Sequence, residues 1–209
     1  AQYLAVPASN IWPLHPQIPD NFAAVMDPLG NAVHTVMSAG VSGKSVLITG
    51  VGIIGLMAVS VAKAAGATHL IAADIDANRM SVARKLGADT CVDTSDKHWP
   101  DKLRELTAGL GPEVVCEMSG AADAINGGLT CLRNCGTMAM LGLAKEAVAV
   151  QFNENVIFKG ARILGISGRR MFESWYQMQD LLLSGRLNLD PIITHEIPLE
   201  DFQRGFKLM

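Results

Sequence analysis

Residues 44–74 read KSVLITGVGIIGLMAVSVAKAAGATHLIAAD, in which an apolar strand, a G-x-G-x-x-G turn, a helix-forming stretch and a second strand ending in a carboxylate follow one another. Gly50 allows a tight turn after the strand Val46–Thr49. Gly52 lets the backbone approach a pyrophosphate, and Gly55 lets the following helix pack closely on the sheet. That helix offers unpaired N–H groups and its positive dipole end to phosphates. The stretch therefore predicts a dinucleotide-binding βαβ unit.

Asp74 ends the second strand of this unit, 19 residues after Gly55. The spacing is close to the roughly 20 residues at which an acid meets the adenosine ribose. A carboxylate there accepts from ribose hydroxyls and repels a 2′-phosphate, so the sequence favours NAD over NADP. Two other classes with similar glycines do not fit: methyltransferases usually carry G-x-G-x-G, and short-chain reductases need Tyr-x-x-x-Lys, whereas Pro7 and Asp180 stand four positions after the two tyrosines. A glycine-rich turn in an unrelated α/β domain is the remaining alternative.

Composition limits the kinds of partner to expect. The 209 residues suffice for one domain with a sizeable core, and the apolar residues come in short blocks, which argues against a membrane span. The net charge of −3 and the scattered Lys and Arg leave no basic stripe, so nucleic acid is not an expected partner. The first residues lack the charged and apolar regions of a secretory signal, and we expect a cytoplasmic protein.

The four cysteines show no C-x-x-C and no Cys/His set with zinc-ligand spacing. We therefore expect no metal site in this chain. Cys91 and Cys116 fall in apolar, strand-like segments and are expected to be inert core thiols. Cys131 and Cys135 flank a turn, and no disulfide is expected for a protein of a reducing compartment.

Strands and helices continue to alternate after Asp74. We expect four further strands, at Thr90–Val92, Glu113–Met118, Thr137–Leu141 and Arg162–Ile166. Helices are expected between and after them, over Asn78–Leu86, Trp99–Leu110, Ala121–Leu132 and Met171–Ser184. This order predicts an α/β fold with a doubly wound (Rossmann), mainly parallel, six-stranded sheet and helices on both faces.

The two ends of the chain stand outside this alternation. Residues 1–26 hold four prolines and one isolated strand candidate, Gln2–Val6, whereas residues 191–209 finish in an amphipathic helix over Leu199–Met209. We therefore divide the chain into a dinucleotide-binding domain at residues 27–190 and two flanking pieces of another domain.

Ligands of open α/β sheets bind outside the carboxyl ends of the strands. This rule selects the glycine turn and Asp74, and it adds three later segments: Ser119 with Gly120, Leu141-Gly142-Leu143, and Ile166-Ser167-Gly168. Leu141 and Ile166 have a second interpretation as core residues. Arg79, five residues after Asp74, either covers the adenosine or is a solvated helix charge.

Taken together, these residues resemble the coenzyme domain of the zinc-dependent medium-chain dehydrogenase/reductase superfamily, and most closely its threonine-oxidising branch. The resemblance covers nearly the whole chain and rests on residues 27–35 (DPLGNAVHT), 50–55 (GVGIIG), 156–160 (VIFKG) and 168–176 (GRRMFESWY). It implies NAD contacts from Ile54, Asp74, Arg79, Leu141, Gly142, Leu143, Ile166 and Ser167. The family commonly has an aromatic residue where this chain has Ser167.

The resemblance also implies an activity. In such enzymes zinc acts on the substrate hydroxyl, a relay removes the proton, and hydride passes to nicotinamide C4. It implies a longer oxidoreductase that converts L-threonine and NAD to 2-amino-3-oxobutanoate and NADH, with zinc ligands before Ala1 and a closing strand beyond Met209. Residues 1–26 and 191–209 would belong to its catalytic domain, and this chain alone would bind NAD without catalysis. The alternatives are a zinc polyol or secondary-alcohol dehydrogenase and a stand-alone NAD-binding module.

Three further residue assignments follow. The resemblance sets Asp27 near the zinc site as a proton relay or an acid behind the ligands, while local chemistry equally suits a helix N-cap ahead of Pro28. His34 is a lone histidine in a helix, and we expect it to be a packed residue and not a metal ligand. The strand Arg162–Ile166 is expected at the sheet edge, where an unpaired apolar strand invites a second copy. The resemblance makes that edge a dimer contact, with tetramers common.

Overall fold

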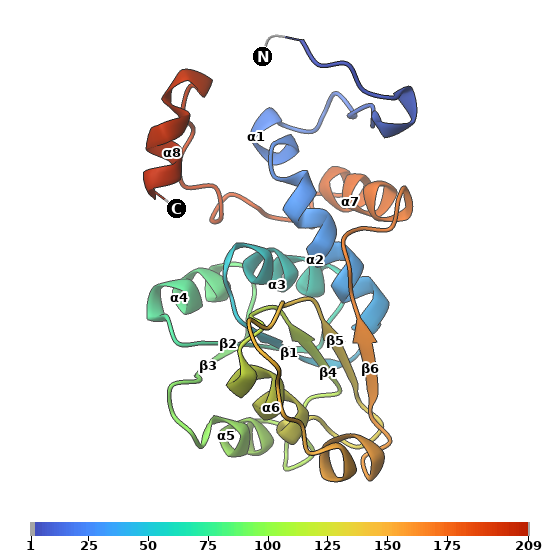
Figure 1. The fold of residues 1–209 in the computed structure, drawn as a ribbon, viewed down its shortest axis with the longest axis vertical. Coiled ribbons are helices and arrows are strands. Elements are labelled where there is room, and N and C mark those ends of the chain that lie inside the picture. The colour runs from blue at the N-terminus through green and yellow to red at the C-terminus, as the bar shows by residue number, and fades with distance from the viewer. Residues whose placement is uncertain (1–2, 209) are drawn as a thin grey trace.

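Within residues 3–208, which this computed structural model describes, six parallel strands form one sheet in the order β3-β2-β1-β4-β5-β6 (Figure 1). The strands are β1 (Ser45–Thr49), β2 (His69–Asp74), β3 (Thr90–Asp93), β4 (Val114–Glu117), β5 (Thr137–Met140) and β6 (Arg162–Gly165). The chain changes direction across the sheet between β1 and β4, where doubly wound sheets form their ligand crevice. The predicted six-stranded Rossmann-type sheet is confirmed.

Helices connect the strands and extend the fold at both ends. The longer ones are α2 (Met26–Ala39), α3 (Ile53–Ala64), α4 (Ala77–Lys85), α5 (Trp99–Leu106), α6 (Ala122–Cys131) and α7 (Glu173–Leu183). The shorter ones are η1 (Ala8–Asn10), α1 (Asp20–Ala23), the π-helical turn η2 (Asn153–Ile157), η3 (Leu199–Asp201) and α8 (Phe202–Leu208).

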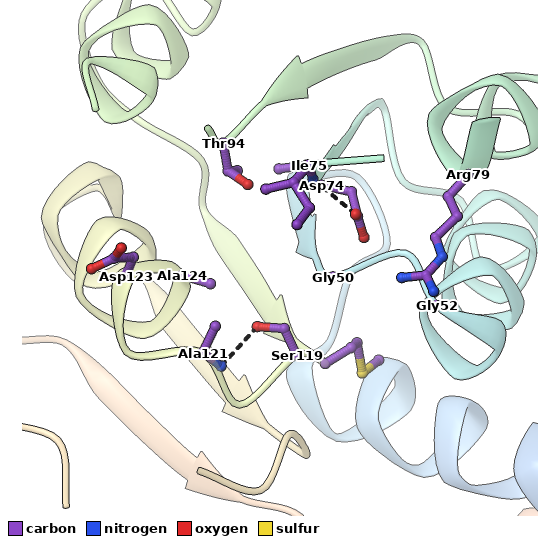
Figure 2. A pocket seen from close by; sticks show the side chains of 12 residues that line it. Gly50, Gly52, Asp74, Ile75, Arg79, Thr94, Ser119, Ala121, Asp123 and Ala124 are labelled. Carbon is purple, nitrogen blue, oxygen red and sulfur yellow. Dashed lines mark hydrogen bonds between the residues drawn. The ribbon is translucent and has the colours of Figure 1, made fainter. Parts of the chain in front are cut away.

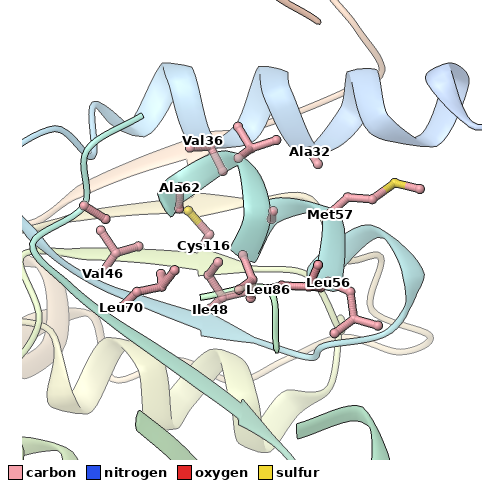
Figure 3. Packing of buried hydrophobic residues seen from close by; sticks show 14 of the residues in the cluster. Ala32, Val36, Val46, Ile48, Leu56, Met57, Ala62, Leu70, Leu86 and Cys116 are labelled. Atoms are coloured by element: carbon pink, nitrogen blue, oxygen red, sulfur yellow. The ribbon is translucent and has the colours of Figure 1, made fainter. Parts of the chain in front are cut away.

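Alternate residues of β1 pack on opposite helical layers. Val46 and Ile48 belong to a core with α2 and α3, where Val36 of α2 lies close to Ala62 of α3 (Figure 3). Leu47 belongs to a second core with α5 and α6. Because both faces of β1 are covered, its three central residues, Val46–Ile48, are all apolar and do not alternate with polar ones. Helices on both faces of the sheet are thereby confirmed.

Two predicted elements are corrected by the structure. Helix α5 ends at Leu106 and not at Leu110, because Ala108 and Gly109 adopt left-handed conformations with φ of +53° and +80° that cannot continue the helix. Of the strand predicted over Gln2–Val6, Gln2 lies outside the described residues, and residues 3–6 form no strand. Tyr3 and Leu4 are 91% and 83% exposed, so no neighbouring strand supplies the hydrogen-bond partners that a strand requires. Met209, the last residue of the predicted terminal helix, also lies outside the described residues.

Both end segments lie on the side of the sheet to which β6 leads (Figure 1). The first segment packs near α7, where the ring of Trp12 stacks on Phe172 at 5.6 Å and meets Tyr176 edge-on at 4.7 Å. The chain that follows α7 contacts α3, where the Ser60 hydroxyl donates to the carbonyl of Asn188 at 2.9 Å. Among the helices of residues 3–208, none combines the length and apolar character needed to cross a bilayer.

Candidate dinucleotide-binding site

The glycine turn between β1 and α3 has the geometry that its sequence predicts. Gly50 has a φ of +79°, and a Cβ added there would lie 2.6 Å from the Cβ of Ser119. A Cβ at Gly55 would lie 2.0 Å from the carbonyl oxygen of Gly50. At Gly52, by contrast, an added Cβ would meet no atom within 4 Å. Two of the glycines are therefore required by packing, while Gly52 leaves open space where a ligand can approach the backbone.

Helix α3 begins directly beyond this open space. Gly52 is its N-cap residue, no side chain caps it, and the amide of Leu56 is bonded to the carbonyl of Gly52. The amides of the first turn before Leu56 consequently have no intrahelical acceptor. They combine with the helix dipole to favour a bound anion. The residues at this turn thus fit the pyrophosphate of a dinucleotide.

Asp74 lies against the same turn from the end of β2. Its side chain is nearly buried, with 6% of the residue exposed. Oδ2 accepts from the amide of Val51 at 2.7 Å, and Oδ1 accepts from the amides of Ile75 and Asp76 at 2.8 and 3.0 Å. These bonds fix the carboxylate beside the glycine turn, with lone pairs still available for ribose hydroxyls.

A cleft of about 450 Å³ joins these features. Its walls come from the ends of β1, β2, β3 and β4 and from the start of α6, and its lining residues are Gly50, Gly52, Ala73, Asp74, Ile75, Arg79, Thr94, Met118, Ser119, Ala121, Asp123 and Ala124. Figure 2 shows Arg79 extending from α4 along one wall, with Ala121 and Ser119 across the cleft from Ile75. Nε of Arg79 is 3.9 Å from Oδ2 of Asp76, and its side chain is 55% exposed.

Of the residues that the sequence predicts, the cleft brings together Gly50, Gly52, Asp74, Arg79 and Ser119. The structure adds Ile75, Thr94, Ala121, Asp123 and Ala124, which the sequence analysis did not select. Ile75 and Thr94 each directly follow a strand, so a consistent use of the strand-end rule identifies them. The three residues of the α6 start are identified only once the strand order is known, because that order brings α6 beside β1.

The other predicted contacts lie around this cleft and not in it. Leu143 is 89% exposed and lines a second cleft of about 540 Å³, which shares Ser119 and Ala121 with the first. Leu141 and Gly142 follow β5, and their amides donate to the carbonyl of Glu117 at 2.9 and 3.1 Å. The remaining three are Ile54, half-buried against the core, and Ile166 and Ser167, which follow β6.

Asp27 pairs with an arginine from the segment after β6. Nη2 of Arg169 lies 2.8 Å from Oδ1 of Asp27, whose side chain is 68% exposed. The prediction of Asp27 as a helix N-cap is wrong: α2 begins at Met26, Val25 occupies the cap position, and Asp27 lies inside the first turn. The role of Asp27 in a proton relay stays a prediction.

Two further contacts join α2 to the same segment. Nδ1 of His34 lies 2.9 Å from the carbonyl oxygen of Gly168, which agrees with a packed histidine. The stem of Arg169 covers Gly30, where an added Cβ would lie only 2.5 Å from the arginine Cδ. The structure therefore brings together two stretches that the sequence singles out, residues 27–35 and 168–176. Arg169 was not predicted as a site residue, and its only signal in the sequence is its place in the second stretch.

Three of the four thiols have a raised pKa, which lowers their reactivity. Burial raises the pKa of Cys116 and that of Cys131 to about 12, and burial also raises the pKa of Cys91. Cys135 is exposed. Across residues 3–208 no three His, Cys, Asp or Glu side chains gather into a group that could hold a metal ion.

Comparison with known proteins agrees with this geometry. Residues 54–184 match the family model described as zinc-binding dehydrogenase. The chain is 46% identical over 209 residues to an L-threonine 3-dehydrogenase of Idiomarina loihiensis, which involves all of this chain and 61% of that protein. It is 48% identical over 211 residues to that of Bacillus velezensis, again over the whole chain and over 60% of that protein. The chain thus spans about three fifths of the length of these curated relatives.

A solved structure shows the same fold. The 2R,3R-butanediol dehydrogenase from Bacillus subtilis superimposes with a TM-score of 0.85 at 26% identity, covering 93% of this chain and 55% of that one. The match to the family model extends from the glycine turn through β6 to the end of α7 and includes more than half of the chain. This family match explains why a glycine turn, an acid at the end of β2 and a parallel sheet occur together. The chain belongs to the zinc-binding dehydrogenase family.

Proposed function

We propose that this chain is the NAD-binding part of an NAD-dependent L-threonine 3-dehydrogenase. The observation that carries the proposal is the pairing, across one cleft, of the open backbone at Gly52 with the fixed carboxylate of Asp74. The high identity to L-threonine 3-dehydrogenases over the whole chain supports the choice of enzyme.

In the proposed complex the pyrophosphate lies at Gly52 and accepts from the free amides at the start of α3. The adenosine ribose donates its hydroxyls to Asp74, and the adenine fits between Ile75 and Ala121. A 2′-phosphate would bring negative charge against the Asp74 carboxylate, so NAD is preferred to NADP. Arg79 lies over the outer side of the adenosine.

The nicotinamide half then extends toward the ends of β5 and β6, where Leu141, Gly142, Leu143, Ile166 and Ser167 are proposed contacts. Bound NAD supplies the hydride acceptor. Asp27 is the proposed proton relay, and Arg169 holds its carboxylate at 2.8 Å. No set of zinc ligands is present in residues 3–208, so zinc does not fit this chain by itself, and we propose that its ligands lie in other segments of the enzyme.

Two alternatives keep the same cofactor. A polyol or secondary-alcohol dehydrogenase is favoured by the likeness to the butanediol enzyme, although the identity is only 26%. A stand-alone NAD-binding module is the other. Protein expressed from the complete reading frame should oxidise L-threonine with NAD and leave sorbitol and 2,3-butanediol nearly untouched. The reverse preference would favour the first alternative, and no oxidation of any of them would favour the second.

We also propose a homo-oligomer, a dimer or a tetramer, formed through β6. This strand ends the sheet, and Ile163 on it is 38% exposed, so its unpaired backbone groups can pair with a second copy. Light scattering on the purified protein should report at least a dimer. A proline at Ile163 should then shift the mass toward the monomer.

The proposal as a whole is tested by titrating the 209-residue chain with NADH and following the nicotinamide fluorescence. Saturable binding, with NADPH at least about tenfold weaker, is the expected result. The absence of binding to a folded chain would overturn it.

A further inference from the structure

A second carboxylate is buried on the other side of the glycine turn. Glu117 ends β4, which pairs with β1 on the side opposite β2, and the residue has no exposed surface. Within residues 3–208 no Lys, Arg or His forms an ion pair with it. A buried carboxyl group without a cation partner must be stabilised by hydrogen bonds.

The donors come almost entirely from the next three residues. Oε1 of Glu117 accepts from the amide of Ser119 at 2.9 Å, from the Ser119 hydroxyl at 2.5 Å and from the amide of Gly120 at 3.1 Å. Oε2 lies 3.1 Å from the same Gly120 amide. The hydroxyl of Thr49, at the end of β1, is 3.4 Å from Oε1. The carboxylate therefore folds the Ser119–Gly120 turn back over the end of its own strand.

That turn divides the two clefts at the carboxyl edge of the sheet. Ser119 lines both clefts, and Gly120 lines the second. The turn also fits closely between its neighbours: an added Cβ at Gly50 would lie 2.6 Å from Ser119, and one at Gly142 would lie 2.1 Å from the Gly120 amide nitrogen. A small shift of this turn would thus reach both the glycine turn and the segment after β5.

The Ser119 hydroxyl is already engaged within the turn. It donates to Glu117 and accepts from the amide of Ala121 at 3.1 Å, as Figure 2 shows for the second bond. The backbone of Ser119 therefore helps to form the wall of the cleft, while its hydroxyl stabilises the turn.

We propose that Glu117 is a positioning residue for the dinucleotide: its buried carboxylate sets the Ser119–Gly120 turn, and through that turn the width of the cleft that takes the adenosine half. Glu117 does not touch the ligand. This inference rests on the proposed NAD binding and names a residue that controls it.

Glu117→Gln is the test, because the amide keeps the size of the side chain but has only one acceptor oxygen. Its NH2 group must then replace one of the two carboxylate oxygens, and both of these accept from the Gly120 amide. Glu113→Gln is the matched control. Glu113 immediately precedes the other end of β4, where its carboxylate accepts from the amide of Ser45 at 3.0 Å and pairs with Arg133 at 3.0 Å. Both substitutions remove a hydrogen-bonded carboxylate, but only Glu117 lies at the end of β4 that adjoins the two clefts.

NADH and ADP-ribose are titrated into both variants and the unsubstituted chain, and unfolding by urea is followed in parallel. We expect Glu117→Gln to weaken both ligands about tenfold, while Glu113→Gln binds within twofold of the unsubstituted chain even where its stability falls. In the NMR spectrum without ligand, the amide signals of Ser119 and Gly120 should move in Glu117→Gln and stay in Glu113→Gln.

Equal ligand affinity in Glu117→Gln and the unsubstituted chain would overturn this inference and leave the proposed function standing. Equal weakening in both variants would also overturn it, since a general loss of stability would then be the cause. Failure of the unsubstituted chain to bind would overturn both proposals. If Glu117→Gln does not fold, Ser119→Ala replaces it, with a loss of about threefold expected and unchanged affinity as the contrary result.

Discussion

The Oδ2 atom of Asp74 accepts a 2.7 Å hydrogen bond from the backbone amide of Val51. The acid that ends β2 therefore holds the glycine turn that follows β1, before any nucleotide is bound. In the proposed complex the same carboxylate accepts from the ribose hydroxyls. One side chain therefore both stabilises the turn and distinguishes NAD from NADP.

Replacing Asp74 by Asn should weaken NADH binding about tenfold, because a charged acceptor is lost, and should narrow the preference for NADH over NADPH by a similar factor. Fluorescence titration with both nucleotides measures the two effects. Asp76→Asn is the control, since Asp76 caps α4 through the amides of Asn78 and Arg79. Because Asn caps a helix about as well as Asp, Asp76→Asn should change the unfolding free energy by less than about 0.5 kcal/mol and leave the preference for NADH unchanged. An unchanged preference in Asp74→Asn would contradict the assigned ribose contact.

Substitutions at two glycines of the turn should have different effects: one should weaken NADH binding, and the other should lower the stability of the fold. Gly52→Ala places a methyl group in open space, so unfolding free energy should change by less than about 1 kcal/mol, whereas NADH affinity should fall at least about tenfold because the pyrophosphate loses that space. Gly55→Ala forces a contact with the carbonyl of Gly50 and should destabilise the fold by about 1–3 kcal/mol. Urea unfolding and NADH titration on both variants check the pair. Normal NADH affinity in Gly52→Ala would rule out the proposed pyrophosphate position.

Asp27→Asn should leave NADH binding by the 209-residue chain within twofold, because Asp27 is 68% exposed and its ion pair with Arg169 is a surface contact. In protein from the complete reading frame, the same change should lower kcat for L-threonine by about a hundredfold if Asp27 relays the proton. Asp20→Asn, which alters an exposed acid of α1, is the control for both assays. An unaltered kcat in Asp27→Asn would remove Asp27 from the relay.

The thiols should differ in their reaction with Ellman's reagent at pH 8. Cys116 and Cys131, whose pKa burial raises to about 12, carry almost no thiolate at that pH and are shielded from the reagent. The exposed Cys135 should react within seconds and the two buried thiols only on unfolding. Denaturant should release all four thiols. Fast reaction of Cys116 or Cys131 in the folded chain would contradict the described core.

Stability should depend on Asp89 in a pH-dependent way. Burial raises the pKa of Asp89, but the hydrogen bond from the Leu70 amide and the ammonium group of Lys63 outweigh it, so the folded-state pKa lies below the ordinary 3.8. The contribution of the carboxylate is therefore present above pH 3.8 and is lost as the pH falls through the folded-state pKa.

Asp89→Asn should accordingly lower the unfolding free energy by about 1 kcal/mol at pH 7, with the deficit shrinking toward zero in acid. Urea unfolding between pH 7 and pH 3 measures it. Asp190→Asn, at an exposed position, should show no such trend. A deficit in Asp89→Asn that is independent of pH would contradict the assignment.

The fold could be predicted because its signals are local. Residues 46–48 are all apolar since helices cover both sides of β1. A glycine with positive φ follows within two residues of the ends of α2, α3, α4 and α7. Helix α5 was predicted to extend past its end, because Ala108 takes a left-handed conformation that alanine rarely adopts and that the sequence does not signal. The strand predicted over Gln2–Val6 had the right composition but no partner, and composition alone cannot supply one.

The site could be predicted only in part, since its walls come from distant segments. The spacing of Gly55 and Asp74 predicts that both face one ligand, because a βαβ unit has a fixed geometry. The approach of Ala121 to Ile75, and the contact of Arg169 with Asp27, depend on which strands become neighbours. Strand order is a property of the whole sheet. Local pattern could therefore select residues after β4 and β6, but it could not predict which of them lie beside the first βαβ unit.

Asp74 and Glu117 stand on either side of β1, and each satisfies backbone amides of the loops around the glycine turn. The conformational entropy of those loops is consequently lost when the chain folds and does not oppose binding later. A dinucleotide that meets such a surface needs only to diffuse in and shed water. Substitutions around the cleft should then act mainly on how long the nucleotide stays, and little on how fast it arrives.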